Sequence, residues 1–257
     1  MLALDIGNSR LKWALFEGRK IVKKNAVVYT TDSIDKLLEE ELLPFAGNDV
    51  WISNVAGKDI GASVSNFFAS TDVGKVTFAA TQAHQCGVEN VYEITANLGV
   101  DRWLAMIAAF NHETREQGEA VCVVDCGTAL TIDVIGAGGQ HVGGLIMPGL
   151  RTMQSSLLDK SGVSQGVGLK SGNVLACGSK NATLLGDSTA ECVELGCSQL
   201  MVEGVSGIIR RQREQLRDLR CFVTGGDAAG VLDYVGENTQ YEPDLVLQGL
   251  LLAGSDR

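Results

Sequence analysis

The chain has 257 residues, of which 45% are hydrophobic and 20% charged, and it carries a formal net charge of −10. This composition is that of an ordinary soluble globular protein, and the length allows one large domain or two domains of about 120–130 residues. The negative charge argues against nucleic acid or an anionic membrane as the main partner, because both attract basic surfaces.

The first half of the chain reads as strands followed by alternating helices and strands. In order, we expect an apolar strand at 2–4 that turns sharply into a second strand, a strand at 20–30, a helix at 34–42, a strand at 49–56, a helix at 60–70, a strand at 75–81 and an amphipathic helix at 99–112. Asp32 or Ser33 is a candidate cap for the helix at 34–42.

The second half repeats this plan. In order, we expect three strands within 121–149 joined by tight glycine-containing turns, a helix at 149–158 with Pro148 at its first turn, a mobile glycine-rich and serine-rich loop at 161–172, a long helix at about 187–217, a strand at 221–226 and two short helical stretches. The basic run at 210–220 reads as the solvated face of a helix. The pattern predicts an α/β fold of two similar lobes, residues 1–115 and 116–257.

The turn that follows the first strand recurs in the second half of the chain. Asp125 lies 120 residues after Asp5, close to half of the chain. After these aspartates, Gly127, Thr128 and Ala129 stand for Gly7, Asn8 and Ser9. Two such turns at half-chain spacing indicate an internal duplication.

Each of these turns combines groups that suit a phosphate. Backbone N–H groups at the glycines can cradle phosphate oxygens, and Asn8, Ser9 and Thr128 can add side-chain donors. Lys12 follows closely enough to reach the same phosphates, and the strand-end aspartates can hold a cation directly or through water. Two hairpins that need no ligand are the alternative. The matched pair, with a third glycine pair within 223–228, favours phosphate binding in a cleft between the lobes.

The remaining reactive side chains indicate no separate chemistry. The seven cysteines form no CxxC and no zinc-type spacing with histidine, so we interpret them as structural thiols in a reducing compartment. The three histidines have no nucleophile nearby in sequence, and we assign them no catalytic role. No signal peptide is recognisable, and we find no window of roughly 20 apolar residues that would span a bilayer, so we expect a cytoplasmic protein.

The doubled Asp-x-Gly hairpin and the later Thr-Gly-Gly-Asp turn resemble the actin, sugar-kinase and chaperone-ATPase superfamily, which is built from duplicated ribonuclease H-like lobes. Within it the chain resembles type III pantothenate kinases nearly end to end. The resemblance rests on their first phosphate motif (5–18), GxDR motif (99–109), second phosphate motif (125–134), GGxIxPG motif (143–150) and the segment with a substrate-contacting threonine (187–196).

The resemblance implies transfer of the ATP γ-phosphoryl group to the primary hydroxyl of pantothenate, giving 4'-phosphopantothenate in the first step of coenzyme A biosynthesis. It implies that Asp101 is the carboxylate beside the attacking hydroxyl. From the residues alone, the better interpretation of Asp101 is an N-terminal helix residue favoured by the helix dipole. The pantothenate pocket would be lined by Tyr92, Gly99, Val100, Asp101, Arg102 and Thr189.

The resemblance also implies the other ligands and the assembly. ATP would be bound by Asp5, Ile6, Gly7, Asn8, Ser9, Arg10, Leu11, Lys12, Gly127 and Thr128. Magnesium would accompany ATP, with Asp5 in water-mediated contact, and Asp125 would be the ligand of a monovalent cation, potassium or ammonium. The family is dimeric, so a homodimer is expected.

Three other functions compete with this one. A sugar or acetate kinase of the superfamily would usually be longer and would lack the GxDR motif. A non-catalytic regulatory or accessory protein on the same fold should have lost Asp101, Asp125 or the phosphate glycines, and all are present. A filament-forming actin relative would need inserted subdomains for which this chain lacks room.

Overall fold

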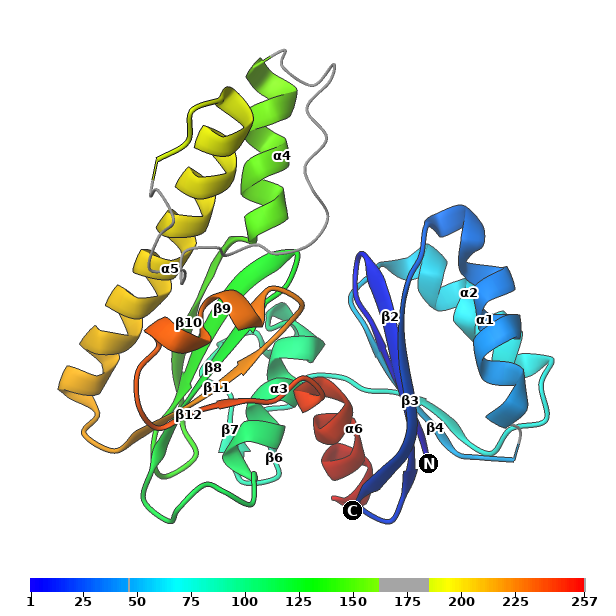
Figure 1. Cartoon of the computed structure of the whole chain (residues 1–257). Helices are drawn as coiled ribbons and strands as arrows, with labels where there is room; N and C mark the ends of the chain where they lie inside the picture. Colours follow the sequence, from blue (N-terminus) through cyan, green and yellow to red (C-terminus); the bar gives the residue numbers. More distant parts are fainter. Residues whose placement is uncertain (46, 162–184, 257) are drawn as a thin grey trace. The chain divides into compact units, whose positions relative to one another are not determined.

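The computed structural model describes residues 1–45, 47–161 and 185–256. The chain divides into two compact units (Figure 1). Unit 1 comprises Met1–Arg115, Gly139–His141 and Asp244–Arg257, and unit 2 comprises Glu116–Gly138 and Val142–Pro243. The loop predicted at 161–172 lies, beyond Ser161, outside the described residues.

Unit 1 is built on a five-stranded mixed sheet with the strand order β3-β2-β1-β4-β5. Its strands are β1 (Leu2–Ile6), β2 (Arg10–Glu17), β3 (Lys20–Val28), β4 (Val50–Asn54) and β5 (Val76–Phe78), and a small separate hairpin is formed by β6 (His84–Gln85) and β7 (Val88–Glu89). Its helices are α1 (Ile34–Leu42), α2 (Lys58–Ala69), α3 (Val100–Phe110) and α6 (Leu245–Ser255), with short 3-10 turns at Thr31–Ser33, Leu43–Phe45 and Thr95–Asn97.

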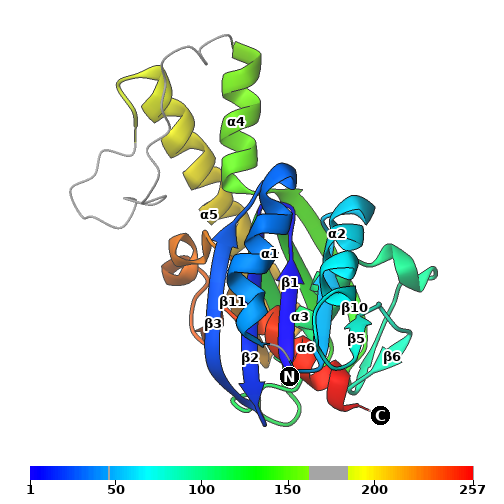
Figure 2. The same cartoon turned by 90° about the vertical axis from the view of Figure 1, so that its right-hand side faces the viewer.

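Alternation along β1 sends its side chains to two different layers of unit 1. Leu2, Leu4 and Ile6 join the core that α1 and α2 close, and both helices lie on the same side of the sheet in Figures 1 and 2. The helices α3 and α6 pack against each other and contact β4. Gly249 permits this close approach, because a Cβ there would lie 2.1 Å from the Leu104 carbonyl oxygen.

Unit 2 is built on a second five-stranded sheet with the order β10-β9-β8-β11-β12. Its strands are β8 (Ala120–Cys126), β9 (Ala129–Ile135), β10 (His141–Pro148), β11 (Leu219–Thr224) and β12 (Thr239–Tyr241). Its helices are α4 (Leu150–Ser161) and α5 (Thr189–Gln215), with 3-10 turns at Ala228–Gly230 and Leu232–Tyr234. Cys122 and Cys126 are buried free thiols in its core, as their apolar role predicts.

The two sheets share one topology. In each, an antiparallel hairpin (β1–β2 or β8–β9) is followed by two strands, β4 and β5 or β11 and β12, that run parallel to the first strand. The second hairpin turn is one residue shorter, because Ile6 pairs with Leu11 whereas Cys126 pairs with Leu130. The residue that corresponds to Ala129 is therefore Arg10 rather than Ser9. The Gly7 N–H donates to the Arg10 carbonyl at 3.0 Å, as the Gly127 N–H donates to that of Ala129 at 3.1 Å.

Some expected boundaries differ from the structure. Pro148 ends β10 instead of starting a helix, and α4 begins at Leu150. The basic run at 210–220 is not one helix face, because α5 ends at Gln215 and Arg220 lies in β11. Helix α6, which we expected in the lobe at 116–257, belongs to unit 1 because its apolar face packs on α3.

The length and hydropathy of α5 contradict the expectation that no segment could span a bilayer. Within the described part of the chain, it is the one helix long and apolar enough to do so. Its residues Met201, Val205 and Ile209 are packed into the core of unit 2. A helix in a protein core can meet the same criteria of length and hydropathy as a membrane span.

Candidate active site

The first predicted phosphate turn connects β1 and β2 of unit 1. Asp5 is half-buried near the end of β1, and the pairing register sets it opposite Lys12 on β2 and Ser53 on β4. Directly paired residues of neighbouring strands share a face of the sheet. A carboxylate, an ammonium group and a hydroxyl are thus gathered on one face beside the turn.

The turn residues themselves divide by exposure. Asn8, Ser9 and Arg10 are exposed and can offer side-chain donors. Ile6 and Leu11 are 0% exposed, so only their backbone groups can face a nucleotide.

Tyr29, just after β3, is a contact of this turn that sequence reasoning did not find. Its hydroxyl donates a hydrogen bond to the Gly7 carbonyl oxygen at 2.7 Å. Burial raises the pKa of Tyr29, and the nearby charge of Asp5 raises it further, so the hydroxyl stays protonated as a donor. No local signal in the sequence marks this contact, since it joins residues 22 positions apart.

The second predicted phosphate turn connects β8 and β9 of unit 2. Asp125 stands opposite Thr131 on β9 and Thr224 on β11, so two hydroxyl-bearing residues flank the carboxylate. Gly225 follows β11 with a φ of +95°, and a Cβ there would lie 2.6 Å from Asp125 Oδ1. The backbone therefore passes close to the carboxylate, as the glycine permits.

The oxygen-rich surroundings of Asp125 fit a hard cation. Carboxylate, hydroxyl and carbonyl oxygens are the ligands that such cations prefer. Within residues 1–45, 47–161 and 185–256, no group of three or more His, Cys, Asp or Glu side chains is arranged to hold a metal ion. A cation here would share its coordination among Asp125, neighbouring oxygens, water and nucleotide.

The carbonyl of Thr128 in the second turn is held from two sides. The Thr152 hydroxyl donates to it at 2.7 Å, and the Gly149 N–H donates to it at 3.0 Å. Gly149 cannot carry a side chain here, because a Cβ would lie 2.1 Å from the Gly127 carbonyl oxygen. This contact explains the glycine that ends the GGxIxPG motif.

The predicted general base lies at the start of α3 in unit 1. Gly99 is the N-cap residue, and Asp101 is in the first turn, where the helix dipole favours a carboxylate. Asp101 Oδ1 accepts the Arg102 N–H at 2.8 Å. A Cβ at Gly99 would lie 2.7 Å from this oxygen, so glycine leaves room for the carboxylate.

Two predicted pantothenate contacts, Tyr92 and Arg102, touch each other. Arg102 is 9% exposed, and its Nη1 donates to the Tyr92 hydroxyl at 3.3 Å. The Tyr92 ring stacks on that of His141, with centroids 5.9 Å apart and an interplanar angle of 11°. His141, to which we gave no catalytic role, is thus part of the structure that supports Tyr92.

The two remaining predicted pantothenate contacts belong to different units of the chain. Val100 opens α3 in unit 1, next to Asp101. Thr189 is the exposed first residue of α5 in unit 2, directly after the N-cap Ser188, whose hydroxyl accepts the Glu191 N–H at 3.4 Å.

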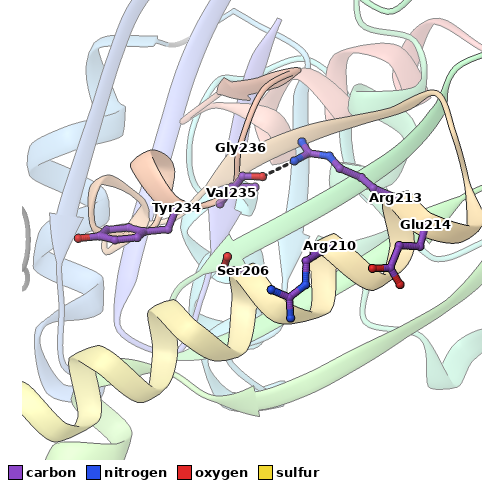
Figure 3. A pocket seen from close by; sticks show the side chains of 7 residues that line it. All are labelled: Ser206, Arg210, Arg213, Glu214, Tyr234, Val235 and Gly236. Atoms are coloured by element: carbon purple, nitrogen blue, oxygen red, sulfur yellow. Dashed lines mark hydrogen bonds between the residues drawn. The ribbon is translucent and has the colours of Figure 1, made fainter.

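A pocket of about 390 Å³ in unit 2 contains none of the predicted site residues (Figure 3). Its lining includes Ser206, Arg210 and Glu214 on α5 and Tyr234 to Gly236 beyond β11. Arg213, which also lies on α5 and lines the pocket, donates hydrogen bonds to the carbonyls of Val235 and Glu237. Its guanidinium is therefore used to hold the loop before β12.

The comparison with known families decides the membership of the chain. The family model described as type III pantothenate kinase matches residues 1–211, which include both hairpins, α3 and nearly all of α5. The chain belongs to the type III pantothenate kinase family.

Curated members of the family match over nearly the whole chain. The type III pantothenate kinase of Nitrosococcus oceani is 30% identical over 260 residues, covering 100% of this chain and 94% of the relative. The type III pantothenate kinase of Pseudomonas savastanoi is 34% identical over 255 residues, covering 98% of each chain.

Solved structures support the mixed α/β fold. The PilM–PilN type IV pilus biogenesis complex contains a chain matched with a TM-score of 0.57 at 11% identity, covering 100% of this chain and 98% of that one. A structure described as a putative Baf family transcriptional activator from Campylobacter jejuni matches with a TM-score of 0.52 at 18% identity, covering 98% and 96%. These likenesses concern the fold alone.

Proposed function

We propose that this chain transfers the γ-phosphoryl group of ATP to the primary hydroxyl of pantothenate, forming 4'-phosphopantothenate in the first step of coenzyme A biosynthesis. The proposal rests on the arrangement at the start of α3, where Gly99 makes room for the Asp101 carboxylate beside the buried Arg102. This arrangement occurs in a member of the type III pantothenate kinase family. The two relatives described above are named type III pantothenate kinases, and the match covers 94% and 98% of their lengths.

Asp101 acts in this proposal as the base that accepts the proton of the attacking hydroxyl. Phosphoryl transfer requires mainly alignment and charge neutralisation, with a carboxylate near the nucleophile. Gly99, Val100, Arg102 and Tyr92 line the pantothenate pocket with Thr189. The planar guanidinium of Arg102 suits a carboxylate such as that of pantothenate.

ATP is bound in this proposal by residues 5–12 of the first turn and by Gly127 and Thr128 of the second. Asp5 would contact magnesium through water, and Asp125 would hold a potassium or ammonium ion. Both cations would neutralise phosphate charge. The shared strand order of the two sheets supports an origin by duplication of a ribonuclease H-like lobe. We further propose a cytoplasmic homodimer.

One assay tests the function. Purified protein is incubated with ATP, magnesium, potassium and pantothenate, and the products are scored for phosphopantothenate and ADP. Parallel reactions contain glucose or acetate as acceptor. Phosphopantothenate formed at a much higher rate than the other phosphorylated products supports the proposal. Preferred phosphorylation of glucose or acetate assigns another small-molecule kinase, and nucleotide binding without turnover on any acceptor indicates an accessory protein.

A further inference from the structure

In both phosphate turns, a hydroxyl from another element holds one carbonyl oxygen. In unit 1, Tyr29 donates to Gly7 at 2.7 Å, and in unit 2, Thr152 donates to Thr128 at 2.7 Å. The two donors differ in type and in position: Tyr29 follows β3, whereas Thr152 lies in the first turn of α4. Each turn is therefore held by a hydroxyl from an unrelated element, although the held carbonyls are not equivalent, because the counterpart of Gly7 is Gly127.

Tyr29 is well anchored for this task. Tyr29 is 8% exposed and belongs to the core of unit 1 with Leu11 and Ile34. Its own N–H donates to the Ser9 carbonyl at 3.5 Å. The ring position is thus set by packing, and its hydroxyl reaches the turn with little freedom to move.

Thr152 acts together with the backbone of Gly149. Both donate to the same Thr128 carbonyl, so both lone pairs of that oxygen are used. The start of α4 thereby fixes the direction of the peptide that joins Thr128 and Ala129.

A held carbonyl also fixes the N–H that follows it. In a trans peptide, the C=O of one residue and the N–H of the next point in opposite directions in one plane. Tyr29 therefore directs the Asn8 N–H away from itself, and Thr152 does the same for the Ala129 N–H. Donors fixed in advance need no reorganisation when a phosphate arrives.

We propose that Tyr29 and Thr152 are positioning residues that orient the backbone N–H groups of the two turns toward the phosphates of the bound nucleotide. The inference rests on the proposed function for the identity of that nucleotide as ATP. Removal of either hydroxyl leaves the turn residues in place but frees their peptides to rotate. We expect the KM for ATP to rise about 2- to 10-fold, the range that corresponds to one hydrogen bond.

The test compares Tyr29→Phe and Thr152→Val with two controls. Thr152→Ser keeps the hydroxyl and should restore the wild-type KM for ATP. Thr71→Val removes a hydroxyl that donates to the Phe67 carbonyl at the same 2.7 Å in unit 1, away from both turns. For each protein, we measure kcat, the KM values for ATP and pantothenate, and the shift of the melting temperature with magnesium-ATP.

The expected result is a raised KM for ATP and a smaller ATP-induced shift for Tyr29→Phe and Thr152→Val, with the KM for pantothenate unchanged and Thr71→Val like the wild type. Wild-type KM values and shifts in both variants would overturn the inference while leaving the proposed function intact. Equal effects in Thr71→Val would also overturn it, since they would reflect general stability. If the wild type makes no phosphopantothenate, the proposed function fails, and the ATP-induced shift still decides the inference.

Discussion

The guanidinium of Arg102 is hydrogen-bonded to the phenol of Tyr92. Nη1 of Arg102 donates to the Tyr92 hydroxyl at 3.3 Å, and Cζ lies 5.9 Å from the ring centroid. Arg102 lies in α3, whereas Tyr92 precedes that helix by several residues. The contact brings two predicted pantothenate contacts together and fixes the fork of the guanidinium.

Replacing Arg102 by lysine should weaken pantothenate binding specifically. Lysine keeps the charge but loses the planar fork and the contact with Tyr92. We expect the KM for pantothenate to rise about 10- to 100-fold, as for a lost hydrogen bond to a charged group, with the KM for ATP nearly unchanged. Arg115→Lys is the control, since Arg115 lies 3.9 Å from the Phe110 ring centroid in the same unit. An unchanged KM for pantothenate would remove Arg102 from the pocket.

Asp101→Asn should lower kcat by roughly 10²- to 10⁴-fold, which is the usual contribution of a general base. The fold should remain intact, because asparagine keeps an oxygen that can accept the Arg102 N–H now bound at 2.8 Å. Steady-state kinetics with pantothenate and a melting curve check both statements. Near-normal turnover would show that Asp101 is a first-turn residue that only complements the helix dipole and has no catalytic role.

The cation assignment predicts a dependence on potassium. Activity should fall when sodium replaces potassium, and Asp125→Ala should abolish the potassium response together with most of the activity. The physical reason is the oxygen-rich setting of Asp125 between Thr131 and Thr224. Asp233→Ala, at an exposed aspartate of unit 2, is the control. Equal rates in sodium and potassium would count against a monovalent cation at Asp125.

Two glycines near the second turn should respond differently to alanine. A Cβ at Gly127 would make ordinary contacts at 3.4 and 3.5 Å, and Gly127 is not among the glycines with a positive φ. Gly127→Ala should therefore keep its melting temperature but raise the KM for ATP, because the methyl group occupies the place where a phosphate approaches the backbone.

Gly225→Ala should instead destabilise the fold by about 1–3 kcal/mol, since it forces alanine into a left-handed conformation. Its Cβ would also lie 2.5 Å from the backbone of Cys126. Melting temperatures without ligand and KM values for ATP separate the two effects. A Gly127→Ala protein with normal ATP kinetics would show that the second hairpin is not a phosphate site.

The lowered pKa of Glu119 predicts that the stability of the fold depends on pH. Burial alone would raise its pKa, but hydrogen bonds from the Glu116 N–H, Asn238 and Arg220, with the charge of Arg220, lower it overall. A lowered pKa stabilises the fold above the ordinary carboxyl value of about 4.3, and this contribution is lost as the pH falls through the folded-state pKa.

The wild type should therefore melt higher than Glu119→Gln at pH 7, with the difference shrinking as the pH falls below the ordinary carboxyl pKa. Glu203→Gln, at an exposed position of α5, should show no such trend. Melting curves from pH 7 to acid conditions measure it. A constant difference between wild type and Glu119→Gln would mean that the ion pair at 3.0 Å to Arg220 contributes no pH-dependent stability.

Local patterns in the sequence were enough to predict several elements. The apolar spacing from Ile34 to Leu42 predicts α1, and its bounds agree with the structure. The helix beginning near Val100 and the two hairpins are confirmed as well. These features depend on periodicity and on turn residues, which act over a few positions. The order of the glycine-bearing motifs also sufficed to identify the family, which the comparison confirmed.

Only the tertiary structure decided which distant residues meet. The one-residue difference between the turns follows from strand register, which no residue type near Ser9 or Ala129 reveals. The contact of Tyr29 with Gly7, and that of Thr152 with Thr128, join segments more than 20 residues apart. Helix α6 packs in unit 1 because its apolar face meets α3, although the chain reaches it last. Register and packing are set by contacts between distant segments, so a local pattern cannot determine them.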